Sequence, residues 1–193
     1  MVTFGLSILI QNSLLEVFTA DSQRLNAGAL EVASIQLGDT LAVGVLPLLN
    51  LVTAGLVLGG LQLFFYRTAL GRALRATADD PEIASLMGID VKQIYAVAMS
   101  LAMAVVAIAG VFLAVRTSFD PSSGPIRLLY AFEAVIIGGL GNLWPTLLGG
   151  VILGVAQTVG AQINPSWQIL SGHLVFLAIL LVRPQGLFPR NKL

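Results

Sequence analysis

The sequence predicts an all-α fold: a polytopic transmembrane helical bundle with one broken or re-entrant helix pair and a short helix outside the membrane. Only 10% of the 193 residues are charged and 56% are hydrophobic, whereas a soluble domain carries about 25% charged residues. So few polar side chains cannot cover a water-facing globule of this size. Several apolar runs also approach the roughly 20 residues that a helix needs to cross a bilayer. We therefore expect residues 1–193 to form a single transmembrane domain surrounded by membrane lipid.

The composition of the chain excludes several classes of function. The formal net charge is +0, so a nucleic-acid partner has no electrostatic support. Cysteine is absent, which removes disulfide and thiolate chemistry. No glycine is followed by lysine, so the chain lacks the phosphate-binding loop of many ATPases. We expect neither a cofactor nor a metal ion in this chain.

Three apolar segments have the length and flanking residues of membrane spans. Residues 41–65 are almost wholly apolar and are followed by an aromatic residue and a cation, which suit the membrane interface. Residues 94–115 carry no charge and give about 33 Å of helix. Residues 169–182 are shorter, but a helix can begin near Trp167 and end before Arg183.

The first residues of the chain, 2–17, are predicted to form the last part of a further span. They include Gln11, Asn12 and Glu16, which are too polar to face lipid alone. We therefore expect this helix to pack against other helices that satisfy these side chains.

The stretch 128–163 is apolar but is interrupted by the sequence GGLGNLWP at residues 138–145. Glycines and a proline leave backbone polar groups unpaired, which lipid does not tolerate, so the break must be buried in protein or line a wet cavity. Pro145 is suited to be the first residue of a new helix, where its missing N–H has no consequence. We expect a short helix from about 129 to 138, a turn, and a second helix from about 145 to 163.

The distribution of cations predicts the orientation of the chain. If the loop 67–93 is cytoplasmic, the span after it leads outward. A broken segment that doubles back then returns the tail 183–193 to the cytoplasm, which places seven cations inside and three outside. The positive-inside rule prefers this arrangement to a single crossing. The cations inside are Arg67, Arg72, Arg75, Lys92, Arg183, Arg190 and Lys192, and those outside are Arg24, Arg116 and Arg127.

The loop 67–93 carries the signals of a short capped helix. Asp80 is suited to be the N-cap, and Pro81 follows as a good first helical residue. Glu82 places negative charge in the first turn, and Gly88 can adopt the left-handed conformation that ends a helix. A helix of barely two turns is marginal in water, and this one carries apolar side chains. It therefore either docks on another protein or lies on the bilayer as a connector.

This loop resembles the coupling loop in the permeases of bacterial ABC importers. The sequence EIASLMG at residues 82–88 fits their E-A-A-x-x-x-G core, with isoleucine in place of alanine at the second position. The run 71–89, the sequence GGLGNLW at 138–144 and the sequence RPQGLF at 183–188 are similar to the branched-chain amino acid permease family in particular. The downstream Ile-x-Leu-Pro of other importers is missing. The family is longer at its N-terminus, so the chain resembles the C-terminal two-thirds of such a subunit.

The resemblance implies an importer of the bacterial inner membrane. Such an importer has two permease subunits, two cytoplasmic ATP-binding subunits and a periplasmic solute-binding protein. This chain would be a multi-pass permease subunit that translocates branched-chain or related amino acids. Loop 67–93 would be its cytoplasmic coupling loop, and ATP would be hydrolysed on the partner subunits. The residues of the loop that match the coupling region are Asp80, Glu82, Ala84, Leu86 and Gly88.

Polar residues inside the apolar segments are the candidates for the translocation path. Glu133 is the one acid in such a segment, where a mid-membrane charge costs about 2.5–3.5 kcal/mol on insertion scales. It should hydrogen-bond a neighbour or contact the ammonium group of the solute. Asn142 either caps the helix that begins near Pro145 or lies where that helix could meet a solute carboxylate. The single histidine, His173, is expected to bond a neighbouring helix rather than a metal ion.

Other interpretations remain open. A secondary, ion-coupled transporter of a small polar solute would also use a broken helix and an intramembrane acid, but it would work without an ATPase. The same permease scaffold also serves amides and urea, so the resemblance does not fix the solute. An intramembrane serine protease is disfavoured because the sequence contains no G-x-S-x-G.

Overall fold

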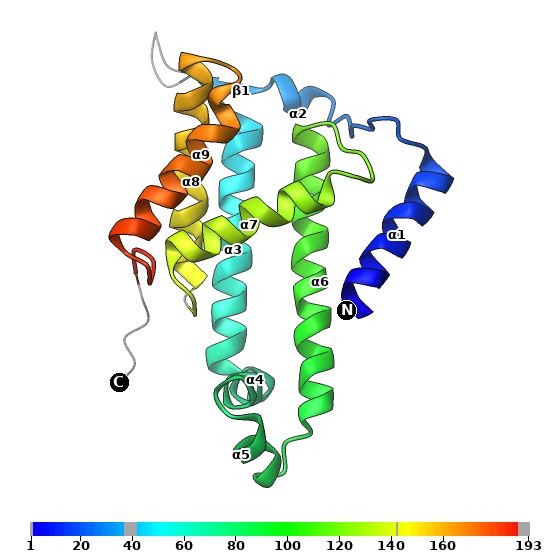
Figure 1. Ribbon diagram of the computed structural model, residues 1–193, viewed down its shortest axis with the longest axis vertical. Helices are drawn as coiled ribbons and strands as arrows, with labels where there is room; N and C mark the ends of the chain where they lie inside the picture. The colour runs from blue at the N-terminus through cyan, green and yellow to red at the C-terminus, as the bar shows by residue number, and fades with distance from the viewer. Residues whose placement is uncertain (1, 37–41, 142, 189–193) are drawn as a thin grey trace. The chain divides into compact units, whose positions relative to one another are not determined.

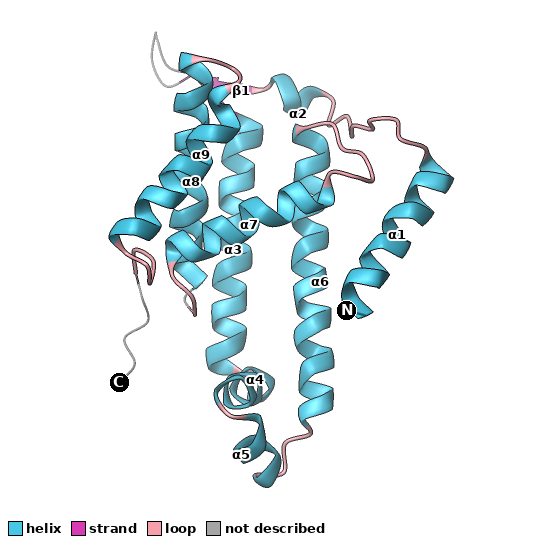
Figure 2. Cartoon of the chain, in the orientation of Figure 1, coloured by secondary structure: helices cyan, strands magenta, loops and turns pink. Residues whose placement is uncertain are grey.

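The computed structural model describes residues 2–36, 42–141 and 143–188. Helices form most of this part of the chain (Figure 1, Figure 2). One small sheet of two strands accompanies them among the described residues. The predicted class, an all-α helical membrane bundle, is therefore confirmed. The contacts within the chain define two compact units, Met1–Asp120 and Pro121–Leu193.

The first unit contains two long apolar helices, α3 (Val45–Arg67) and α6 (Val91–Arg116). Both are long and apolar enough to cross a membrane. They confirm the predicted spans, except that residues 42–44 belong to strand β2 rather than to the first span. No residue of α3 is buried within the described part of the chain. Its apolar surface must therefore be covered by lipid or by other protein.

Two short helices, α4 (Ala69–Asp79) and α5 (Pro81–Leu86), connect α3 to α6. The inner face of α4 consists of Gly71, Leu74 and Thr77, which are buried at the three-residue spacing of one helix face. A Cβ atom on Gly71 would collide with backbone atoms of Phe64 and Phe65. This glycine therefore lets α4 turn sharply against the end of α3.

The N-terminal helix α1 (Val2–Phe18) occupies the segment that was predicted as the end of a span. The Nδ2 atom of Asn12 donates to the carbonyl oxygen of Ile8 at 2.8 Å, within the same helix. This local bond satisfies one N–H group of Asn12, and the packing of this helix against other helices stays a prediction.

The segment between α1 and α3 forms backbone hydrogen bonds with residues at the C-terminal end of α6. The short helix α2 (Ala29–Val32) leads into strand β1 (Ser34–Gln36), which pairs antiparallel with β2 (Ala42–Gly44). Before α2, the backbone of Gln23 exchanges hydrogen bonds of 2.8 and 2.9 Å with Phe119. The ladder between β1 and β2 and this backbone bridge were not predicted from the sequence.

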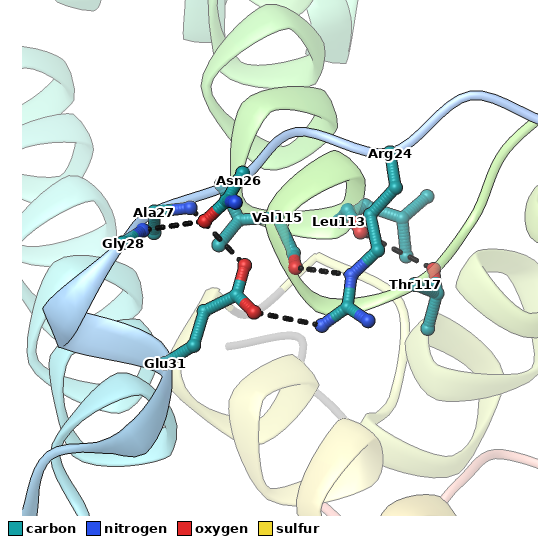
Figure 3. Close-up of polar contacts among 8 residues, drawn as sticks. All are labelled: Arg24, Asn26, Ala27, Gly28, Glu31, Leu113, Val115 and Thr117. Atoms are coloured by element: carbon teal, nitrogen blue, oxygen red, sulfur yellow. Dashed lines mark hydrogen bonds and ion pairs between the residues drawn. The ribbon is translucent and has the colours of Figure 1, made fainter.

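Arg24 is tied to the same end of α6 (Figure 3). Its Nε atom donates to the carbonyl oxygen of Val115 at 3.5 Å, and its Nη2 atom lies 3.2 Å from Oε2 of Glu31. Because α6 begins just after α5, Arg24 and Arg116 lie at the end of α6 opposite to α4 and α5.

The second unit consists of α7 (Gly124–Gly138), α8 (Leu143–Ile163) and α9 (Trp167–Val182). The break between α7 and α8 and the bounds of α9 lie where the sequence predicted them. However, α7 begins before residue 129, and α8 begins two residues before Pro145, which is therefore not the first helical residue. Pro145 still lies in the first turn, where a backbone N–H has no partner within the helix.

Glycines bring the three helices of this unit close together. A Cβ atom on Gly149 of α8 would collide with the carbonyl oxygen of Ala134 on α7, and one on Gly160 would collide with Ser171 on α9. The Oγ atom of Ser171 donates to the carbonyl oxygen of Ala156 across the α8–α9 interface at 2.9 Å. Such small residues allow the close backbone approach that joins helices in lipid.

Candidate functional site

Helix α5 begins with the cap that its sequence predicted. The Oδ1 atom of Asp80 accepts the N–H groups of Glu82 at 2.9 Å and Ile83 at 3.0 Å. Pro81 is the first helical residue, where its missing N–H has no consequence. Asp80 therefore fixes the corner between α4 and α5.

The other end of α5 is closed by a left-handed turn. Gly88 has a φ of +82°, a conformation that glycine adopts without the steric cost of a Cβ atom. Its N–H donates to the carbonyl oxygen of Ser85 at 3.0 Å, and the N–H of Ile89 donates to that of Ala84 at 3.1 Å. These two bonds form a Schellman motif, which confirms the local role predicted for Gly88.

The two faces of α5 differ sharply in exposure. Ala84 is only 3% exposed and faces the chain itself, whereas Leu86 is 85% and Met87 78% exposed. The resemblance counts Ala84 among the residues that match the coupling region. In the structure this side chain is buried within the chain itself. The exposed large apolar side chains of α5 and of its C-cap are those of Ile83, Leu86 and Met87, which we call the α5 apolar tip.

The support beneath this tip comes from α4 and α6. Leu74, Thr77 and Ile94 are buried in the same unit. The Arg75 guanidinium lies 4.5 Å from the centre of the Tyr66 ring, a distance suited to cation–π attraction. Sequence reasoning counted Arg75 only as a cation for orientation. The nine-residue separation of Tyr66 and Arg75 did not predict this contact, because it depends on the sharp turn between α3 and α4.

A second candidate site lies between α7 and α9. Glu133 is 3% exposed, and its Oε1 atom is 2.5 Å from Nδ1 of His173. The ring of Tyr130 stacks on the His173 ring with centroids 5.9 Å apart. Glu133 therefore has the interhelical partner that the sequence required, and His173 bonds a neighbouring helix as predicted.

The helices packed against α7 carry no other charged side chain near this pair in sequence. Helix α8, which packs against both α7 and α9, contains no Asp, Glu, Lys, Arg or His, and His173 is the one such residue in α9.

One oxygen of Glu133 remains available. The Oε2 atom is buried and has no hydrogen-bond partner among the described residues, and a buried acceptor without a donor is costly. It can accept a hydrogen bond from water or from an ammonium group. The other predicted path residue, Asn142, lies outside the described residues. The glycines on its N-terminal side, Gly139 and Gly141, both have positive φ.

Comparison with known proteins identifies the family. Residues 1–182 match the model of the family described as "Branched-chain amino acid transport system / permease component". The chain belongs to this family. Together with three helices that are long and apolar enough to cross a membrane, this makes it a multi-pass membrane protein and a component of a transport permease.

Individual relatives of this chain are named as transport permease proteins. The chain is 32% identical over 194 residues to BraD, a high-affinity branched-chain amino acid transport system permease protein of Pseudomonas aeruginosa, and the match covers 97% of this chain and 62% of BraD. It is 31% identical over 134 residues to LivH of Escherichia coli, which has the same description, with 68% and 44% covered. It is also 33% identical over 124 residues to FrcC of Rhizobium meliloti, a fructose import permease protein, with 58% and 34% covered.

The chain thus spans less than two thirds of the length of these curated relatives. No solved structure shows a significant match to it.

Proposed function

We propose that this chain forms part of a permease subunit in an ATP-driven importer of the bacterial inner membrane, and that it translocates branched-chain or related amino acids. The observation that carries this proposal is the α5 apolar tip. A helix of six residues, capped at both ends, holds Leu86 and Met87 almost fully exposed beyond the end of a long membrane helix. Exposed apolar side chains on a rigid, capped support are suited to contact another protein.

The partner at this tip is proposed to be a cytoplasmic ATP-binding subunit. The chain contains no Gly-Lys sequence and so has no phosphate-binding loop of its own, which leaves ATP hydrolysis to such a subunit. By the family resemblance, a second permease subunit and a periplasmic solute-binding protein complete the importer. The unburied surface of α3 is suited to contact with lipid or with further permease segments.

In this proposal the loop 67–93 and the tail 183–193 are cytoplasmic. Arg24 and Arg116 lie at the end of α6 away from the loop, which supports counting both as external cations. In the second unit, the N–H of Leu187, just after α9, donates to the carbonyl oxygen of Ile137 in α7 at 2.9 Å. The C-terminal ends of α7 and α9 therefore meet, which supports a segment that doubles back between them.

Glu133 is proposed to contribute to the translocation path, with the Oε2 atom as an acceptor for the ammonium group of the solute. The support for this role is that the oxygen has no partner in the described chain and that a carboxylate attracts a cation strongly in an apolar environment. Asn142 remains a proposed neighbour of this path on sequence grounds.

The test is uptake of radiolabelled leucine by proteoliposomes that contain the intact importer, its binding protein and enclosed ATP. We expect uptake to require ATP and to persist after an ionophore collapses the ion gradients. Uptake that needs an ion gradient but no ATP would instead identify a secondary transporter. Competition by fructose, acetamide and urea distinguishes the solute classes, and we expect isoleucine and valine to compete best.

A further inference from the structure

The turn after α9 packs against the broken end of α7. Residues 183–187 carry the sequence RPQGL, and the N–H of Leu187 donates to the carbonyl oxygen of Ile137 at 2.9 Å. Ile137 itself is fully buried. Two sequence segments that were singled out separately, the glycine-rich break and the C-terminal turn, therefore form one contact.

Two glycines make this contact possible. Gly139 has a φ of +101° and Gly186 a φ of +83°, so both adopt conformations that other residues resist. A Cβ atom on Gly186 would lie 2.5 Å from the carbonyl oxygen of Ile136 and 2.7 Å from Cα of Gly139. A Cβ atom on Gly139 would lie 2.8 Å from the carbonyl oxygen of Phe188. The two backbones therefore touch directly, with no room for a side chain.

The contact supplies a hydrogen-bond donor to a backbone carbonyl at the end of α7. This helix has 15 residues and is about 22 Å long, shorter than the roughly 30 Å hydrocarbon core of a bilayer. The N–H of Gly139 donates to the carbonyl oxygens of Val135 and Ile136 at 3.0 and 3.2 Å. The next carbonyl, that of Ile137, receives its donor from Leu187. Without the turn this oxygen would lack that partner in surroundings that supply little water.

We propose that the turn 183–187 is a latch that positions the broken helix α7 for translocation. The latch contacts no solute. It holds Ile137, which lies one helical turn beyond Glu133 on the same face of α7, and so fixes the direction in which Glu133 is presented. The loss of the latch leaves the membrane helices inserted but lets the end of α7 move. The effect on transport rests on the proposed importer function, whereas the contact itself does not.

Two matched pairs of variants test the latch in the intact importer. Gly186→Ala places a methyl group against α7, and its control is Gln185→Ala at an exposed neighbour. Leu187→Pro removes the N–H donor and fixes the backbone φ at this position, and its control, Leu187→Ala, keeps that donor. We expect Gly186→Ala and Leu187→Pro to lower the maximal rate of ATP-dependent uptake by about tenfold or more, with membrane levels and ATPase association unchanged. Both controls should transport like the wild type.

A labelling experiment tests the contact without transport. The chain has no cysteine, so Leu140→Cys supplies a single label beside the break, at a side chain that is already exposed. We expect the rate of maleimide labelling at this position to change in the Gly186→Ala and Leu187→Pro backgrounds and to stay constant in both controls. Unchanged labelling in both variants, or wild-type uptake by both, would overturn the latch. Uptake by the wild type that does not depend on ATP would instead refute the importer function and leave the labelling result valid.

Discussion

The side chains of Glu133 and His173, forty positions apart in the sequence, meet with an Oε1–Nδ1 distance of 2.5 Å. This contact ties the broken helix α7 to the last helix, α9. The Tyr130 ring stacks on the histidine, so the imidazole is held from two directions. The second carboxylate oxygen of Glu133 is left buried without a partner among the described residues. One side chain can therefore have both a structural contact and a free acceptor.

The structural part of this arrangement predicts energetic coupling. Glu133→Ala and His173→Ala should each lower the stability of the protein, and the double variant should lose less than the sum of the two single losses. Hydrogen bonds between membrane helices contribute about 0.6 kcal/mol on average and about 1.7 kcal/mol at most. We expect a coupling energy in this range from unfolding in detergent. Thr158, whose hydroxyl bonds within α8, provides the control, because Thr158→Ala with Glu133→Ala should be additive within about 0.5 kcal/mol.

The free oxygen predicts a separate effect on transport. Glu133→Gln keeps the size of the side chain and an atom that can bond His173, but it removes the negative charge. Stability should stay near that of the wild type, while uptake of an amino acid should fall about tenfold to a hundredfold, since a hydrogen bond to a charged group contributes about 1.5–3 kcal/mol. The measurement is the rate of ATP-dependent uptake at equal membrane levels. Unchanged uptake would limit Glu133 to its structural bond with His173.

Local signals in the sequence were sufficient for most of the helical fold. The caps of α5 were predictable because Asp80, Pro81 and Gly88 act on backbone groups only a few residues away. The start of α7 was placed too late, although Pro125 in its first turn is a recognised sign of a helix beginning. The pairing of β1 with β2 was missed because residues 42–44 are as apolar as the span that follows, and strand pairing depends on a distant partner.

The candidate site was predictable only in part, because tertiary contacts determine which side chains meet. The sequence required a partner for Glu133 but did not identify His173 as that partner. Which face of α9 meets α7 depends on how α8 packs between the two helices. The inward orientation of Ala84 depends on α4 and α6 packing around α5, which the spacing within α5 does not determine. Sequence similarity marked both the GGLGNLW and RPQGLF segments, yet their contact through Gly139 and Gly186 required the fold.

The orientation of the chain predicts which positions react from each side of the membrane. Single cysteines at Glu82, Ser118 and Gln185 replace exposed residues in a protein that has no cysteine. A membrane-impermeant maleimide added to intact cells should label Ser118→Cys and spare the other two. In inside-out vesicles the pattern should reverse. Labelling of Ser118→Cys and Gln185→Cys from the same side would refute a segment that doubles back, because a single crossing places both outside.

The α5 apolar tip predicts where a coupling defect can be separated from a folding defect. Leu86 and Met87 make few contacts within the chain, so Leu86→Ser and Met87→Ser should change its stability by less than about 0.5 kcal/mol. If a partner covers these side chains, each substitution removes about 1.5–3 kcal/mol of favourable burial free energy. This loss corresponds to ATPase association that is about tenfold to a hundredfold weaker. Ala84→Asp should behave differently, because it would place a carboxylate inside the loop and disturb the chain itself.

The control for this prediction lies at the opposite end of the first unit. Leu30 on α2 is also an exposed leucine, but α2 joins the β1–β2 end of α3 rather than the α4–α5 end. Leu30→Ser should therefore leave ATPase association and ATP-dependent uptake at wild-type levels, while Leu86→Ser reduces both. Co-purification of the ATPase with each variant, at matched membrane levels, gives the association directly. If Leu86→Ser and Met87→Ser together keep wild-type association and uptake, α5 is a connector on the membrane surface and the coupling role is refuted, because a polar side chain facing water or lipid headgroups has no contact to lose.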